Sequence, residues 1–204
     1  EIDKINSKSD ILVAIASLHQ KGVNSLFYFG VGQDLKNVER HISYLGQSGI
    51  GLPNKDYYLK ENKKEILDAY FTHLVKGFEY LGKTHEQAMV CAKNTLLIET
   101  NLAQGMLSPA ELRSPEKTYN KKTVKETTTL FGSFRFPQYL KLIGFQDIAS
   151  LIVSNPEYLG KCNQLLIDFD VQIWKDYLQW CLFNEFAGHL STELIEYNFD
   201  FYGK

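Results

Sequence analysis

The 204-residue sequence lacks several features that would place it in a special class of protein. Its three cysteines, Cys91, Cys162 and Cys181, form no Cys-x-x-Cys pair, so each is expected to be a small buried apolar residue rather than a ligand or nucleophile. No apolar run approaches the roughly 18 residues of a membrane span. An excess of positive charge is also missing: 22 basic and 24 acidic residues give a formal net charge of -2, which argues against a nucleic-acid-binding protein.

Aromatic residues, by contrast, are abundant. There are 12 Tyr and 13 Phe, while the hydrophobic (44%) and charged (23%) fractions are typical of a soluble globular protein. So many rings predict a thick interior or broad aromatic contacts. The chain starts at Glu1 rather than Met and ends in the aromatic segment Tyr197–Gly203, so we expect the native protein to be longer.

The spacing of apolar residues predicts a mainly α-helical fold. Side chains recur with a period near 3.6 in several stretches, which is typical of amphipathic helices. Three pairs that can form capping boxes mark further helix starts: Thr84 with Gln87, Ser108 with Glu111 and Thr123 with Glu126. The predicted helices cover residues 9–21, 62–81, 84–104 and 168–190, with others starting at Pro109, Val124 and Pro156.

A small β-hairpin is predicted near residues 25–45. The aromatic run at residues 25–32 would pair with residues 41–45 across the polar segment 33–40, although such a run also fits a buried helix. Residues 151–153 fit a short strand or a buried linker. Residues 46–58 contain three glycines and a proline and therefore predict an irregular loop, and residues 134–144 an aromatic segment packed on the core.

No short motif in the chain indicates an active site. His85-Glu86 begins like the zinc motif H-E-x-x-H, but that motif needs a second His one turn later and Met89 stands there. The other histidines lie far from any second His or Cys, so they are expected on the surface or on helix flanks rather than at a metal: His19, His41, His73 and His189.

Four other patterns are equally incomplete. Gly30-Val31-Gly32 lacks the third glycine of a dinucleotide site, and Gly46–Ile50 misses the last position of a nucleophile elbow. Asp168-Phe169-Asp170 lacks the rest of a calcium loop and is expected to start a helix. The lysines at 117, 121, 122 and 125 are interspersed with Glu116 and Glu126 and predict a solvated face.

Residues 47–58, Gln-Ser-Gly-Ile-Gly-Leu-Pro-Asn-Lys-Asp-Tyr-Tyr, resemble the Q-x-G-L-G-L-P-x-R-D-Y-Y segment of the neprilysin and endothelin-converting-enzyme family of zinc metalloendopeptidases. Ile50 replaces Leu and Lys55 replaces Arg. Other segments resemble the family in the same order, with Ser114 in place of an Asp: Asp34–Asn37, Glu99 with Leu102-Ala103, Glu111–Arg113, Tyr119–Lys121, Pro156–Leu159, Tyr177–Trp180 and Phe199–Gly203.

The resemblance implies that residues 1–204 are part of the N-terminal helical region of such a peptidase. The family's zinc signature and downstream Glu ligand would lie beyond this chain, so we expect no catalytic, cofactor-binding or metal-binding residue in it. The parent would hold zinc, bind peptide substrates and supply a catalytic lobe as partner. We expect an exported, bacterial protein of the periplasm or envelope. An independent helical interaction module without peptidase activity is the alternative.

Overall fold

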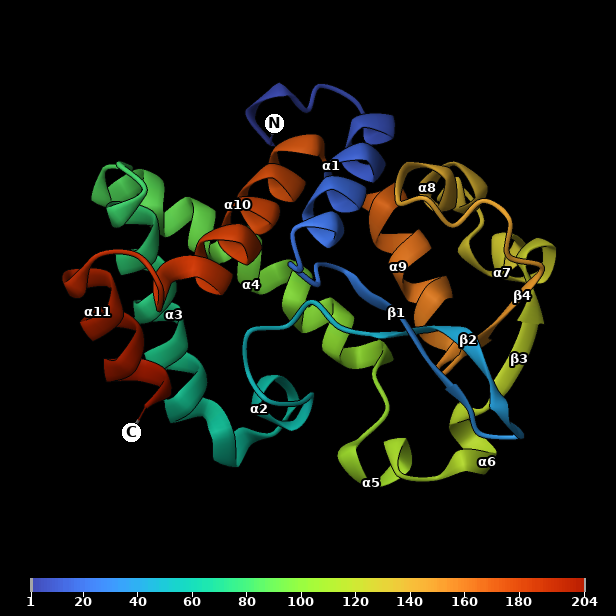
Figure 1. Cartoon of the computed structure of the whole chain (residues 1–204). Coiled ribbons are helices and arrows are strands. Elements are labelled where there is room, and N and C mark those ends of the chain that lie inside the picture. Colours follow the sequence, from blue (N-terminus) through green and yellow to red (C-terminus); the bar gives the residue numbers. More distant parts are fainter. Residues whose placement is uncertain (1, 204) are drawn as a thin grey trace.

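The computed structural model describes residues 2–203, which fold into a helical body with a small sheet at one side (Figure 1). Within that range no helix is both long and apolar enough to cross a membrane. Two 3-10 turns, Ile2–Lys4 and Glu61–Lys63, accompany the helices. The helices are α1 (Lys8–Gln20), α2 (Asp56–Leu59), α3 (Lys64–Tyr80), α4 (His85–Gly105), α5 (Pro109–Leu112), α6 (Pro115–Thr118), α7 (Val124–Phe131), α8 (Phe136–Leu142), α9 (Pro156–Asp168), α10 (Val171–Ala187) and α11 (Thr192–Tyr202).

The helix starts follow the capping chemistry expected from the sequence. Thr84, Ser108 and Thr123 each accept a hydrogen bond from the backbone N–H three residues on, in complete capping boxes. Such a side chain satisfies a donor that the first helical turn leaves without a partner. Asn155 caps α9 in the same way. The mainly α-helical prediction is therefore confirmed.

The predicted hairpin is also confirmed, within a four-stranded sheet of order β1-β2-β4-β3. Strands β1 (Phe27–Asp34) and β2 (Asn37–Gln47) are antiparallel, so the predicted connection over residues 33–40 was too long. Strand β4 (Ser150–Val153) runs parallel to β2, and β3 (Asn120–Thr123) pairs antiparallel with β4. β3 was not predicted, because its four polar residues show no apolar alternation.

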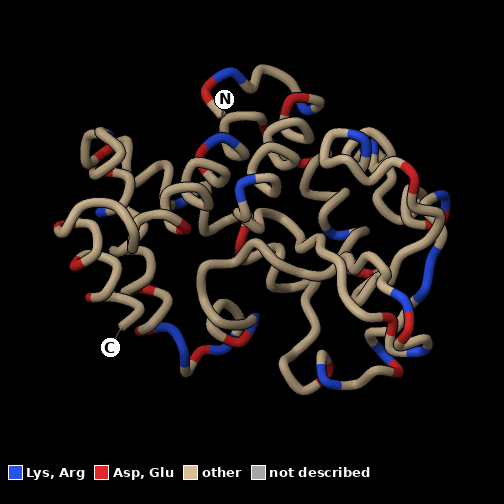
Figure 2. Tube along the Cα trace, in the orientation of Figure 1, with Lys and Arg blue, Asp and Glu red and all other residues tan. Residues whose placement is uncertain are grey.

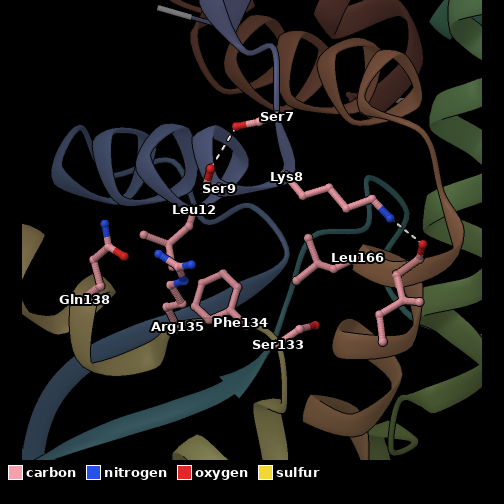
Figure 3. Close-up of a pocket in the computed structure, with 10 residues that line it drawn as sticks. Ser7, Lys8, Ser9, Leu12, Ser133, Phe134, Arg135, Gln138 and Leu166 are labelled. Atoms are coloured by element: carbon pink, nitrogen blue, oxygen red, sulfur yellow. Dashed lines mark hydrogen bonds between the residues drawn. The ribbon is translucent and has the colours of Figure 1, made fainter.

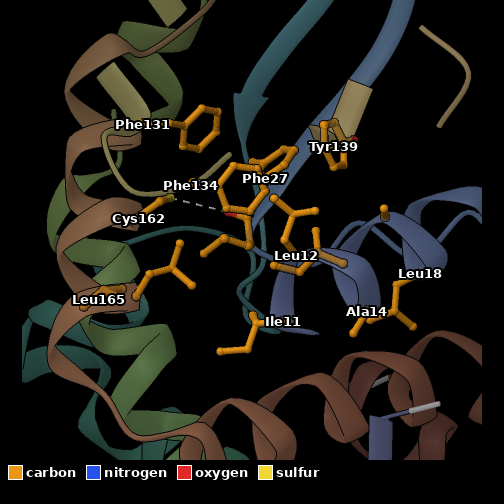
Figure 4. Close-up of a cluster of buried hydrophobic side chains, with 14 of the residues drawn as sticks. Ile11, Leu12, Ala14, Leu18, Phe27, Phe131, Phe134, Tyr139, Cys162 and Leu165 are labelled. Carbon is orange, nitrogen blue, oxygen red and sulfur yellow. Dashed lines mark hydrogen bonds between the residues drawn. The ribbon is translucent and has the colours of Figure 1, made fainter. Parts of the chain in front are cut away.

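Two clusters of buried side chains form the interior, and α4 and α10 contribute to both. One cluster joins α1, β1 and the segment 131–140 to α9, with Phe27 ringed by Phe131, Phe134 and Tyr139 (Figure 4). The other joins α3, α4, α10 and α11. Many of the Phe and Tyr side chains thus lie in the core, where they contact one another among aliphatic side chains.

Three details differ from the sequence predictions. Asp168 ends α9, and Asp170 precedes the first residue of α10, so Asp168-Phe169-Asp170 joins two helices instead of starting one. The C-terminal aromatic segment is a helix, α11. His73 is buried rather than on a surface, because the rings of Tyr197 and Phe201 stack on it at centroid distances of 4.2 and 4.6 Å.

Candidate functional site

The most distinctive site in the molecule is the segment Gly46–Tyr58, called the glycine loop here. Its first two residues, Gly46 and Gln47, end β2, and its last three, residues 56–58, lie in α2. The prediction of an irregular loop is therefore confirmed for residues 48–55. Hydrogen bonds join the loop to Glu99 on α4, to Tyr158 on α9 and to Tyr177 on α10. It therefore connects the sheet to the helical body.

A single carboxylate lies beneath the loop. Glu99, on α4, is only 1% exposed. Its Oε2 accepts a hydrogen bond of 2.7 Å from the Tyr58 hydroxyl, and its Oε1 accepts one of 3.0 Å from the Tyr70 hydroxyl. Each hydroxyl in turn accepts a bond of 2.9 Å, from the Leu52 backbone N–H and from Trp180 Nε1 respectively. The result is a buried hydrogen-bonded network drawn from α2, α3, α4, α10 and the loop.

Burial raises the pKa of Glu99 to about 7, although hydrogen bonds from Tyr58, Tyr70 and Gly51 partly oppose the shift. Burial and the neighbouring Glu99 raise the pKa values of both tyrosines well above their ordinary value. A carboxyl group that titrates near neutrality can in principle act as a general acid or base. A pocket of about 270 Å³ borders it, lined by Asn24, Ser48, Gly49, Gly51, Asn184 and Glu185 among others.

Among the described residues, Glu99 and Glu185 are the two carboxylates that line this pocket. Each oxygen of the Glu99 carboxylate accepts a hydrogen bond from a tyrosine hydroxyl. Within residues 2–203 no group of three or more His, Cys, Asp or Glu side chains could hold a metal ion. The two bonds to Glu99 join α4 to α2 and α3.

Two glycines of the loop are required by close contacts. Gly49 has a positive φ of 88°, and a Cβ there would lie 2.3 Å from the Tyr177 hydroxyl and 2.6 Å from the backbone nitrogen of Leu26. At Gly51 a Cβ would lie 2.0 Å from the Tyr70 hydroxyl. Only a residue without a side chain lets the loop backbone approach the tyrosine hydroxyls this closely.

The loop backbone is held by two further buried tyrosines. The Tyr177 hydroxyl donates to the carbonyl of Gly49 at 2.8 Å and accepts from the N–H of Leu26 at 2.9 Å. The Tyr158 hydroxyl lies 2.5 Å from the carbonyl oxygen of Ser48 and 2.8 Å from that of Leu26. These contacts tie the loop to the chain segment that enters β1.

Side chains at both ends of the loop secure the segment that follows α4. Gln47 exchanges two hydrogen bonds with the backbone of Leu107, at 3.0 and 2.8 Å, and its oxygen also accepts a bond from Asn155. The Lys55 ammonium donates to the carbonyl of Met106 at 2.9 Å. Lys55 therefore links the loop to the residue that follows α4.

The weak motifs do not converge on a second site. His85 is exposed and lies 2.7 Å from a carboxylate oxygen of Glu79. Gly30 and Gly32 lie within β1, and Ser48 bonds the carbonyl of Asn24. Among the lysines at residues 117–125, one pairs with Glu111 and one with Asp34, in a surface of mixed charge (Figure 2).

A larger pocket, of about 430 Å³, lies between the start of α1, residues 133–138 and the end of α9 (Figure 3). Its floor is apolar, with Leu12, Phe134 and Leu166. Lys8 donates to the carbonyl of Ile167, and Arg135 lies among the lining residues. The pocket contains no Asp, Glu, His or Cys side chain, so it offers neither an acid–base pair nor metal ligands.

The outer face of α11 exposes large apolar side chains. Ile195 and Phe199 lie one helical turn apart, and Phe199 is 61% exposed, whereas Tyr202 is 42% exposed but its ring lies edge-on to His73 at 5.3 Å. Phe201 lies on the other side of the helix, against the rings of His73 and Tyr70. Phe199 thus lies at the surface of α11, whereas Phe201 belongs to the interior.

Comparisons with known proteins give a consistent picture. A family model described as Peptidase family M13 matches residues 1–204. Endothelin-converting enzyme 1 of Cavia porcellus is 29% identical over 167 residues, which are 79% of this chain and 22% of that protein. The neutral endopeptidase of Lactobacillus helveticus is 25% identical over 175 residues, or 86% of this chain and 27% of that protein.

A solved structure shares the fold almost completely. The Mycobacterium tuberculosis zinc metalloprotease Zmp1, in complex with an inhibitor, superposes with a TM-score of 0.93 at 27% identity. The match covers 99% of this chain and 31% of that one. The chain thus spans about a quarter to a third of these relatives.

Proposed function

Because the chain belongs to peptidase family M13, we propose that it is a non-catalytic helical part of a zinc-dependent metalloendopeptidase. In this proposal residues 1–204 lie in the N-terminal region of the parent, and a C-terminal catalytic lobe outside this chain supplies the zinc ligands and the catalytic Glu. The zinc would activate a water molecule for attack on a peptide bond. The chain's own residues would form the helical wall that helps to enclose the substrate chamber.

The glycine loop is the observation that carries the non-catalytic part of the proposal. Its tyrosine hydroxyls, its glycines and Glu99 are all used by internal contacts. A catalytic carboxylate must instead reach the substrate or a water molecule. The loop would therefore have a structural role, because its hydrogen bonds hold the helices of this region in a fixed arrangement.

The outer face of α11 supports a lobe–lobe contact. Phe199 and Tyr202 leave apolar surface in water, which a partner lobe would cover. Radical footprinting of the parent and of the isolated chain tests this point. Phe199 and Tyr202 should be modified less in the parent than in the isolated chain. Tyr28 is the internal reference, because it is exposed to the same 42% as Tyr202 and should be modified equally in both samples. Equal modification in the two samples would contradict the contact.

Two assays on the purified chain test the absence of catalysis. Metal analysis should find no stoichiometric zinc, and a quenched fluorogenic peptide should not be cleaved. One tightly bound zinc per chain, or cleavage by the chain alone, would refute the proposal. The parent, with the same peptide and with a chelator as control, should cleave it in a zinc-dependent manner.

An independent interaction module is the competing function, and the native open reading frame distinguishes the two. An H-E-x-x-H motif within a few hundred codons after Lys204 supports the peptidase, and a nearby stop codon supports the module. We also propose an exported bacterial parent, since relatives from Lactobacillus helveticus and Mycobacterium tuberculosis share this domain. Fractionation of the native cells, with detection of this chain, would locate it; recovery in the cytoplasm would contradict export.

A further inference from the structure

The pocket of about 430 Å³ between the start of α1, residues 133–138 and the end of α9 has no part in the proposed function; it is called the α1 pocket here. Its size falls within the roughly 300 to 1,000 Å³ that is usual for small-molecule sites. The side chains of its floor, Leu12, Phe134 and Leu166, are at most 6% exposed and belong to the hydrophobic core. Such a fixed apolar floor suits an apolar ligand group.

The charge of the α1 pocket has one sign. Lys8 and Arg135 line it, and none of its lining residues is acidic. Asp10, on the same helix as Lys8, uses its carboxylate to accept hydrogen bonds of 2.9 Å from the backbone N–H groups of Asn6 and Ser7. The pocket is therefore complementary in charge to an anion.

Two donors at the rim have no partner in the protein. The Lys8 ammonium already donates to the carbonyl of Ile167, but within residues 2–203 the side chains of Arg135 and Gln138 form no hydrogen bond or ion pair. Figure 3 shows Gln138 beside Arg135, and Phe134 between Arg135 and Leu166. A guanidinium presents two parallel N–H groups that match a carboxylate, and an amide adds a further N–H.

We propose that the α1 pocket binds a small organic carboxylate. The carboxylate would accept hydrogen bonds from Arg135 and Gln138, and its apolar chain would lie on Leu12, Phe134 and Leu166. A peptide fits less well, because its backbone N–H and C=O groups would lie without partners on the apolar floor. Ser133 cannot supply a donor there, since its N–H and its hydroxyl both donate to Asn163 Oδ1, at 2.8 and 2.5 Å.

NMR titration of the ¹⁵N-labelled chain with octanoate tests the site and its location together. The amide signals of Arg135 and Gln138 should shift and reach saturation. Octanamide has the same chain length without the charge and should bind roughly tenfold more weakly. Sodium chloride should weaken the binding of octanoate and leave that of octanamide unchanged. Failure to saturate, shifts confined to another part of the chain, or equal affinities of the two probes would overturn the proposal.

A pair of variants tests the part played by Arg135. Arg135→Gln should lower the affinity for octanoate roughly tenfold and leave that for octanamide within about twofold, because the apolar floor is retained. Arg113→Gln removes an exposed arginine outside the pocket and should change neither affinity. An unchanged affinity for octanoate in Arg135→Gln would overturn the assignment.

A peptide that ends in a free carboxylate tests the choice of a small acid. Acetyl-Ala-Leu-Phe offers the same charge and an apolar group on a peptide backbone, and it should bind more weakly than octanoate. Tighter binding of this peptide would overturn the choice and assign the pocket to a peptide C-terminus. Neither zinc nor cleavage enters these measurements, so their outcome is independent of the proposed function.

Discussion

Substitution of Glu99 by glutamine should change how the stability of the chain depends on pH. Burial in the folded protein raises the pKa of this carboxyl from its ordinary value of 4.5 to about 7. Between these two pH values the folded state retains a proton that the unfolded state has released. The contribution of Glu99 to the free energy of unfolding therefore falls as pH rises from 4.5 to 7 and is constant above that range.

The size of the effect follows from the shift. A rise of about 2.5 pH units, at about 1.4 kcal/mol each, makes the ionised form of Glu99 cost roughly 3 kcal/mol of stability above pH 7. Glutamine does not titrate and can still accept from one tyrosine and donate to the other. Relative to the wild type, Glu99→Gln should therefore gain about 3 kcal/mol between pH 4.5 and pH 8.

Urea unfolding followed by circular dichroism, at pH 4.5, 6, 7 and 8, measures this difference. Comparison of variant with wild type at each pH cancels the titration of the other groups. Glu86→Gln is the matched control, since Glu86 lies on the same helix but is exposed, and its profile should stay parallel to that of the wild type. Parallel profiles for Glu99→Gln as well would show that Glu99 is not buried in this network.

Three further changes test the loop and its supports. Gly49→Ala should destabilise the chain by roughly 3 kcal/mol or more, because the new Cβ would clash with Tyr177 and φ at this position is positive. Gly160→Ala is the control: there is open space around this residue, so the substitution should raise the urea midpoint slightly. If both variants unfold at the same urea concentration, the close contact does not exist. Tyr158→Phe removes the hydroxyl that the carbonyls of Ser48, in the loop, and Leu26, before β1, share as a donor, and it should cost about 1 to 3 kcal/mol in the same assay; no change would mean that water replaces the hydroxyl. Thr84→Ala should cost about 1 kcal/mol and speed amide exchange at Gln87, and unchanged exchange there would argue against the cap.

Local chemistry made most of the fold predictable. The capping boxes at Thr84, Ser108 and Thr123 were readable because both partners lie within four residues in the sequence. Strand β3 was not readable, since its pairing with β4 joins residues about 30 apart and its side chains are polar. Helix α11 was missed because apolar side chains occupy both its inner and its outer face, which obscures the helical period.

The site was predictable only in part. The resemblance drew attention to the glycine loop and to Glu99, but nothing in the sequence shows that Glu99 is buried beneath Tyr58 and Tyr70. Those side chains come from positions 29 and 41 residues away, and only the packing of three helices brings them together. The burial of His73 was hidden for the same reason, because its ring partners lie on α11.

The network around Glu99 shows what a costly buried carboxyl can contribute to the fold. Tyr58 and Tyr70 come from α2 and α3, and Trp180 comes from α10, which contributes to both buried clusters. Apolar side chains tolerate small displacements, but a buried donor left without its acceptor costs about 1 to 3 kcal/mol. A shift of α3 relative to α10 would break the bond between Tyr70 and Trp180. The network therefore favours one arrangement of α2, α3, α4 and α10 around Glu99, at the expense of stability above neutral pH.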